Sequence, residues 1–182
     1  MSAERKKTIL RTIRITQELD DLLKVDAQES NLSVNALIDK IMMKYTEWDR
    51  HAKKFGFVSL SSETFRSILN EVDDSGAERL GLNLGGSVGK ALTMFWFRKV
   101  NLENFLELIS LYGKYTGDFT CQITQNGKGY MITLHHSLGR KWSVYLKNFI
   151  SEFIRTVTGV LPQTDISDAS IVISSHARPS GG

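Results

Sequence analysis

The chain has 182 residues, of which 41% are hydrophobic and 24% charged, and its formal net charge at pH 7 is +3. This composition is typical of a globular protein and excludes a disordered chain, and the length suits one domain with a small second unit. The single cysteine, Cys121, excludes an intrachain disulfide, and no apolar run predicts a membrane span or a secretion signal. We therefore expect a cytoplasmic protein.

The charges near the N-terminus are distributed unevenly. The basic residues of the first segment are Arg5, Lys6, Lys7, Arg11 and Arg14, against the single acid Glu4. The residues that follow, as far as Asp39, are rich in Asp and Glu. A basic arm beside acidic helices suits contact with nucleic-acid phosphates, although a solvated basic tail has the same composition.

The first 50 residues predict one strand and two helices. Residues 8–15 are rich in β-branched residues, and polar and apolar positions alternate from Thr12 onward, as in a half-buried strand. Thr16 and Ser33 are candidate N-caps of two amphipathic helices. Apolar residues then recur at helical spacing, first at Leu19, Leu22, Leu23 and Ala27, and then at Val34, Leu37, Ile38, Ile41, Met42, Tyr45 and Trp48.

These three elements cannot bury their apolar faces as a monomer, because the strand has two open edges and the helices lack a second layer. We therefore expect an intertwined dimer in which two strands pair antiparallel and four helices close the core. The residues expected in this dimer core are Ile13, Ile15, Leu19, Leu22, Leu37, Ile38 and Ile41. A two-stranded ribbon of this kind fits the major groove of B-DNA.

The order of strand, Thr-Gln-Glu-Leu helix start and Asn-Leu-Ser-Val-Asn-Ala-Leu-Ile turn resembles the Arc/MetJ ribbon-helix-helix family over roughly residues 7–48. The resemblance implies a homodimer, or a tetramer of paired dimers, bound to double-stranded DNA. It implies base contacts from alternate strand residues, here Leu10, Thr12 and Arg14, and backbone contacts from Lys6, Lys7, Arg11, Ser33 and Asn35. Leu10 departs from the polar residue that is more usual there, and Arg11 falls at a core-facing position of the strand. Either the strand register shifts near its start, or Arg11 reaches round to a phosphate.

The rest of the chain predicts a second domain of mixed structure. We place the ribbon-helix-helix module at residues 1–50, a joint at 51–56, an α+β oligomerisation or effector domain at 57–176 and a disordered tail at 177–182. The predicted strands are residues 57–60, 119–124, 130–135 and 170–174, and the predicted helices cover about 61–72, 101–115 and 141–157. Without the stretch 77–98 this order is β-α-β-β-α-β, which resembles the ferredoxin-like effector domains of some ligand-responsive regulators. The predicted fold class is therefore α+β.

The glycines between residues 81 and 89 do not form a phosphate-binding loop, because the pattern would need glycine at residue 84, which is leucine, and Ser or Thr at residue 91, which is alanine. We predict that Gly81, Gly85 and Gly89 form a small-residue stripe on one helix face, where another backbone approaches closely. A ligand-binding loop is the alternative.

Candidate metal ligands and nucleophiles are few. The metal-ligand candidates are Cys121, His135, His136 and His176, but their spacing matches no metal motif, and adjacent histidines on a strand point to opposite faces. Ser137 and Ser143 lie near His136 without a Gly-x-Ser-x-Gly elbow. We therefore predict no metal, no other cofactor and no enzymatic activity.

The sequence thus predicts a homodimeric, sequence-specific DNA-binding transcription regulator that acts by binding. Two alternatives stay open. One is a dimerising scaffold or antitoxin-like module that binds another protein, and the other is a regulator that responds to a metal or a small molecule. The sequence does not identify an effector.

Overall fold

The chain divides into two compact units, Met1–Tyr45 and Thr46–Gly182. The computed structural model describes residues 9–126 and 129–175, and none of the helices in these ranges is long and apolar enough to cross a membrane. The predicted tail at residues 177–182 lies outside them. Each unit is described below by itself.

The first unit contains two helices, each begun by the predicted cap. Helix α1 (Gln17–Glu29) follows Thr16, whose hydroxyl accepts a hydrogen bond from a first-turn N–H at 3.3 Å. Helix α2 (Val34–Lys44) follows Ser33, whose hydroxyl accepts a similar bond at 3.2 Å. Both N-caps and both helices predicted from the sequence are therefore confirmed.

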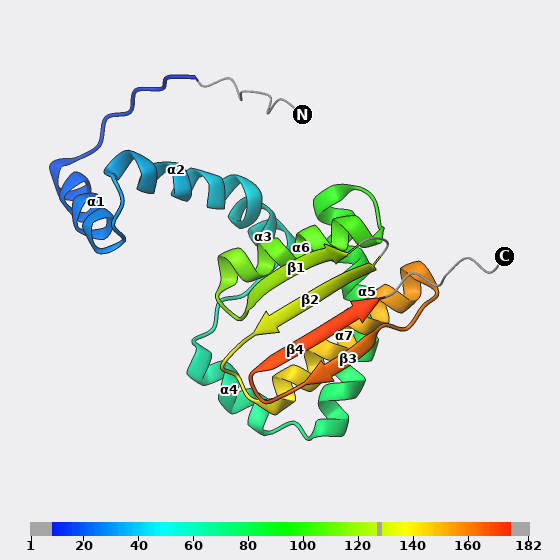
Figure 1. Cartoon of the computed structure of the whole chain (residues 1–182). Coiled ribbons are helices and arrows are strands. Elements are labelled where there is room, and N and C mark those ends of the chain that lie inside the picture. The colour runs from blue at the N-terminus through cyan, green and yellow to red at the C-terminus, as the bar shows by residue number, and fades with distance from the viewer. Residues whose placement is uncertain (1–8, 127–128, 176–182) are drawn as a thin grey trace. The chain divides into compact units, whose positions relative to one another are not determined.

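A four-stranded antiparallel sheet forms the centre of the second unit, with the strand order β1-β2-β4-β3. The strands are β1 (Thr120–Asn126), β2 (Gly129–His135), β3 (Gln163–Ile166) and β4 (Ser170–Ser175). The helices are η1 (Tyr45–Asp49, a π-helix turn), α3 (Arg50–Phe55), α4 (Ser62–Asn70), α5 (Asp74–Phe97), α6 (Leu102–Thr116) and α7 (Arg140–Thr158). Figure 1 shows α7 behind the four strands, with the opposite face of the sheet open toward the viewer.

The two central strands alternate between the core and the outer face of the sheet. Ile132 and Leu134 on β2 pair with Ile173 and Ile171 on β4, and all four side chains are fully buried. Met131 and His135, the residues directly before Ile132 and directly after Leu134, are exposed. Buried side chains of α6 and α7 complete this core. The sheet therefore packs one face against these two helices.

The second unit begins earlier than the boundary at residue 50 expected from the sequence. Trp48, expected on the apolar face of the second helix, is only 5% exposed and packs with Ala52, Leu92 and Leu108. The expected joint at residues 51–56 is largely the helix α3. A buried tryptophan thus makes this segment part of the second core.

Hydrogen bonds of Glu47 connect η1 to helices α5 and α6. Its carboxylate accepts hydrogen bonds from the Tyr115 hydroxyl at 2.5 Å and from Lys114 Nζ at 2.9 Å, both on α6. Its backbone carbonyl accepts one from Trp96 Nε1 on α5 at 3.3 Å. These bonds reach across the sequence and explain why the unit starts at Thr46.

The predicted α+β class is confirmed, but the ferredoxin-like strand order is wrong. The predicted helices near 61–72, 101–115 and 141–157 are present as α4, α6 and α7, and the other three predicted strands are present as β1, β2 and β4. Residues 57–60 form no strand, because aromatic rings rather than a neighbouring strand hold Phe57. The fourth strand is β3, a short edge strand of mainly polar residues.

Helices α5 and α7 pack at backbone distance. A Cβ atom added at Gly81 would lie 2.5 Å from the carbonyl oxygen of Tyr145, and one added at Gly85 would overlap the carbonyl of Phe149. Gly89 is also buried, against the ring of Phe153. The predicted stripe of small residues is therefore confirmed, and its close neighbour is another helix.

Gly85→Ala should destabilise the second unit, whereas Gly86→Ala should stabilise it. At Gly85 the new methyl group meets backbone that cannot turn aside, so we expect a net loss of about 1–3 kcal/mol in the free energy of unfolding. At Gly86 the nearest atom is in the flexible side chain of Glu152, 3.6 Å away. The better helix propensity of alanine should there add up to about 1 kcal/mol.

Urea denaturation followed by tryptophan fluorescence measures this difference, because all three tryptophans, Trp48, Trp96 and Trp142, lie in the second unit. Effects of the same sign and size at the two glycines would contradict the proposed close contact.

Candidate functional sites

The residues predicted to contact DNA bases lie on an exposed segment before α1. Leu10, Thr12 and Arg14 are all exposed, Leu10 to 92%. Residues 9–16 form no strand within the single chain. A strand of a two-stranded ribbon takes its hydrogen-bond partners from the second strand. The ribbon therefore stays a prediction about the dimer.

The first unit leaves most of its apolar side chains in solvent. Ala27 is the one buried residue within 9–45. Of the predicted dimer core, Leu37 and Ile38 are half-buried, and the exposed members are Ile13, Ile15, Leu19, Leu22 and Ile41. Burying one side chain of this size is worth about 1.5–3 kcal/mol. A partner that covers this surface would therefore stabilise the unit strongly.

The N-terminus of α2 differs from that of α1 in charge. The first turn of α1 carries Glu18 and Asp20, whereas the first turn of α2 carries no acidic residue. Ser33 caps α2, and Asn35 is exposed beside it. Free N–H groups at a helix N-terminus attract anions, so the start of α2 is the better place for a phosphate. The other predicted backbone contacts are Arg11, which is exposed, and Lys6 and Lys7, which lie outside the described residues.

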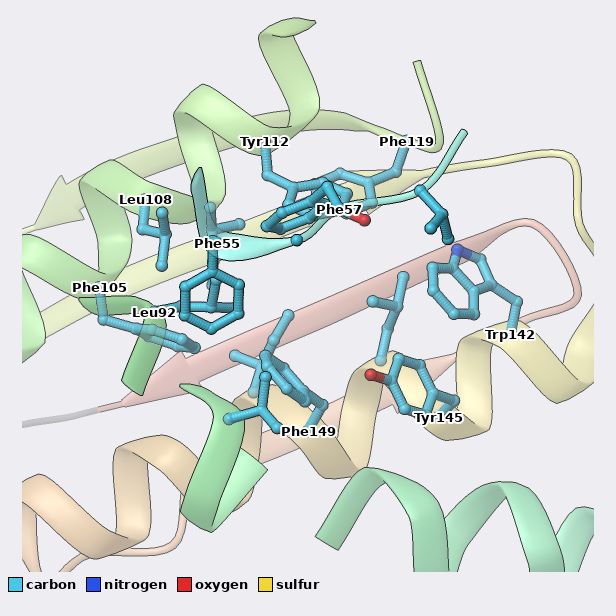
Figure 2. Close-up of a pocket in the computed structure, with 16 residues that line it drawn as sticks. Phe55, Phe57, Leu92, Phe105, Leu108, Tyr112, Phe119, Trp142, Tyr145 and Phe149 are labelled. Atoms are coloured by element: carbon cyan, nitrogen blue, oxygen red, sulfur yellow. The ribbon is translucent and has the colours of Figure 1, made fainter. Parts of the chain in front are cut away.

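The second unit contains a cavity of about 370 Å³. It lies between α5, α6 and α7, and the end of α3 and residues 56–58 border it on the remaining side. Aromatic residues make up half of its lining, and no charged residue lines it. Figure 2 shows Tyr112, Phe119 and Phe57 on one wall, facing Tyr145 and Phe149 on α7.

Trp142 and Tyr145 lie at one end of this cavity. Their rings stack with centroids 4.8 Å apart, and Phe65 packs edge-to-face against Trp142. Trp142 Nε1 is buried and has no hydrogen-bond partner in the part of the chain that the structure describes. Burial raises the pKa of Tyr145 to about 12, so its hydroxyl stays protonated at neutral pH. The residues that line the cavity thus carry N–H and O–H groups but no charge, and the Trp142 N–H is covered by neighbouring side chains.

The predicted metal-ligand candidates do not converge. Cys121 pairs with buried Leu134 and lies on the core side of the sheet, whereas His135 is exposed on the other side. Burial raises the pKa of the Cys121 thiol to about 11, which disfavours the thiolate that binds metals. Among residues 9–126 and 129–175 no group of three or more His, Cys, Asp or Glu could hold a metal ion, and His176 lies outside these ranges.

His136 forms a hydrogen-bonded pair with Ser143, with Nε2 and Oγ 2.8 Å apart. The Nδ1 atom of His136 accepts a hydrogen bond from the Leu138 N–H at 3.3 Å. The proton of the neutral ring is therefore on Nε2, so the imidazole donates to Ser143. A general base would instead have to accept the serine proton. This geometry argues against Ser143 as a nucleophile, and the pair links the residue that follows β2 to α7.

Comparison of the chain with protein-family models, with curated proteins and with solved structures gives no match in any of the three. The function must therefore be inferred from the residues of the chain itself. Two features support such an inference: the exposed segment with its two uncovered helices, and the aromatic cavity of the second unit.

His136→Gln should reduce the pH dependence of stability in the second unit. Burial, and to a smaller extent His135, lowers the pKa of His136 below its ordinary value of 6.5. The unfolded chain therefore binds this proton more readily than the folded chain does. The free energy of unfolding should consequently decrease as the pH falls through 6.5 and become level below the folded pKa.

Urea denaturation at several pH values tests this prediction, because glutamine keeps a donor for Ser143 but does not titrate. His51→Gln removes another histidine whose pKa is lowered by burial, and it should leave the His136 contribution in place. An unchanged pH dependence in His136→Gln would show that another group is responsible.

Proposed function

We propose that this protein is a homodimeric, sequence-specific DNA-binding transcription regulator of the ribbon-helix-helix kind. The segments before α1 from two copies pair as a two-stranded ribbon that enters the major groove. Helices α1 and α2 of both copies close the core beneath this ribbon. The protein acts by binding, and the second unit serves as an oligomerisation or effector domain.

The proposal rests on one observation above all: two well-capped helices that have almost no core of their own. With Ala27 as the buried residue of 9–45, the unit needs a partner to cover its apolar side chains. A second copy offers the same surface, and a two-fold axis lets each copy cover the other. An intertwined dimer therefore supplies the missing layer without a further component.

The alternation of the exposed segment supports a ribbon that reads DNA. If Ile13 and Ile15 face the helices, then Thr12 and Arg14 project from the opposite face, because strand residues alternate. Arginine suits a bidentate contact with guanine, threonine a single hydrogen bond and Leu10 an apolar contact with a thymine methyl group. The N-terminus of α2 would then fix the register by contacting a phosphate.

A dimerising module that binds another protein would need the same apolar core. The basic residues favour DNA over this alternative, because Arg11 and Arg14 lie on the proposed ribbon and the start of α2 is free of acids. A ligand-responsive regulator is a further candidate, which the aromatic cavity of the second unit favours.

Leu22→Asp should convert the dimer into monomers. Leu22 is 59% exposed in the single chain, so the change costs little within one copy. In the proposed core it would bury a carboxylate without a partner. Sedimentation should give one chain of 20.5 kDa for this variant and two for the wild type.

Gln28→Asp is the matched control, because Gln28 is exposed on the opposite face of α1, and this variant should stay dimeric. Unchanged tryptophan emission would show that the second unit of both variants is folded. A monomeric wild type, or a dimeric Leu22→Asp variant, would exclude the intertwined core.

Arg14→Ala should weaken binding to the preferred DNA site more than binding to random DNA. The site is first selected from randomised duplexes at near-physiological salt, and we expect a short inverted or tandem repeat. The variant should lose about 1–3 kcal/mol on this site and relax the preference at one base pair per half-site.

Arg11 is proposed to contact phosphate, so Arg11→Ala should weaken binding to the preferred site and to random DNA about equally. It should also reduce the slope of log affinity against log salt concentration by about one unit per arginine. Selection without any enriched motif, leaving only salt-sensitive background binding, would make the ribbon a dimerisation device.

A further inference from the structure

The cavity of the second unit is much larger than the voids that ordinary packing leaves in a protein interior. Protein interiors are close-packed, and the few voids they contain are seldom larger than a water molecule. An apolar cavity of about 150 Å³ is enough to bind benzene. At about 370 Å³ the present cavity falls within the range of small-molecule sites.

We propose that this cavity binds a small, uncharged, mainly aromatic molecule that carries a hydrogen-bond acceptor. No charged side chain lines the cavity, so an ionised ligand would lose its hydration without gaining a partner. Flat rings from α6 and α7 dominate the walls, as Figure 2 shows for Phe105, Tyr112 and Phe149. Such walls favour a flat apolar ligand, because aromatic pairs stack or pack edge-to-face.

A route into the cavity lies beside residues 56–58. Val58 lines the cavity and is nevertheless 82% exposed, so this part of the wall also meets solvent. Gly56, with φ of 97° in the left-handed region, ends α3 and reverses the chain. This turn allows Phe55 and Phe57, on either side of it, to line the same cavity.

The indole N–H of Trp142 is the second observation that points to a ligand. Trp142 is buried in the cavity wall, and the described residues provide no acceptor for its Nε1 atom. A buried N–H group without an acceptor is unfavourable, and most such groups in proteins are paired. Neighbouring side chains cover the nitrogen, so the proposed contact requires that one of them turns aside. An acceptor at this end of the cavity would complete the pair.

This inference extends the proposed function by giving the effector unit a class of ligand. Ligand binding is measured with the full chain and without DNA. Failure to select a DNA site would therefore leave it intact, and failure to bind the ligand would leave the DNA-binding proposal intact.

The first experiment titrates the full-length protein with N-phenylnaphthylamine, an uncharged probe whose fluorescence rises in apolar surroundings. We expect saturation at one probe per chain and displacement by naphthalene and by quinoline. Naphthoate, which has the same rings and a negative charge, should not displace the probe. Failure of the probe to bind, or equal displacement by naphthoate, would overturn the proposal.

Val88→Trp fills the cavity from α5 and should weaken probe binding by about tenfold or more. Leu82→Trp is the matched control, because Leu82 is exposed on the same helix and does not line the cavity. Circular dichroism shows whether both variants fold. Val58→Trp provides a second test at an exposed position that cannot disturb the core, and it should also weaken binding. Equal affinities for the wild type and the Val88 and Val58 variants would overturn the assignment of this cavity.

Quinoline and naphthalene test the acceptor, because they share one shape and differ by a ring nitrogen. In the wild type, quinoline should gain from the Trp142 N–H. Trp142→Phe keeps an aromatic ring but removes the donor, and it should shift the ratio of the two affinities by about fivefold against quinoline. A ratio that does not change would overturn the role of Trp142 as the donor.

Discussion

The close contact between α5 and α7 is the constraint on which the second unit depends. The stripe Gly81, Gly85 and Gly89 meets Tyr145, Phe149 and Phe153 in turn, so the two helices run parallel with the same spacing of four residues. Each glycine lowers helix stability by about 1 kcal/mol relative to alanine, and only a close approach of backbones offsets that loss. At Gly81 and Gly85 the nearest atoms of α7 include backbone carbonyls, whereas at Gly89 they are ring atoms. The helices therefore separate toward the end of the stripe.

That contact also explains how a cavity can persist inside a packed unit. Tyr145 and Phe149 touch α5 through their backbone, and their rings line the cavity. Because their main chain is held in place, only a change of rotamer could carry these rings farther into the space between the helices. Val88 and Leu92 on α5 and the rings of α6 close the remaining sides. A fold that needed only stability would fill such a space, since unfilled apolar volume weakens a core. The aromatic, uncharged lining is thus better explained as a binding surface than as an accident of packing.

Local pattern was sufficient to predict the helices but not the tertiary features. The caps Thr16 and Ser33 and the α6 and α7 periodicities are local signals, and the structure contains all of them. The strand predicted at 57–60 is absent because Phe57 is held by Trp48, which no local pattern reveals. The edge strand β3 was missed because mainly polar residues form it. The cavity was not predictable, because its walls come from segments that are far apart between residues 55 and 150. The local sequence of each segment predicts only an ordinary helix face or a loop.

The two units differ in how much apolar core each one contains, and the segment of chain that joins them is short and helical. The first unit has almost no core of its own, so if it dimerises as proposed, its folding depends on protein concentration. The second unit has its own core around the sheet. In sequence, α2 continues through η1 into α3, and Phe55 at the end of α3 lines the cavity. A ligand alters DNA binding only if it favours one arrangement of the chain over another. In sequence this connection contains the π-helix turn η1, which marks a departure from regular helix geometry.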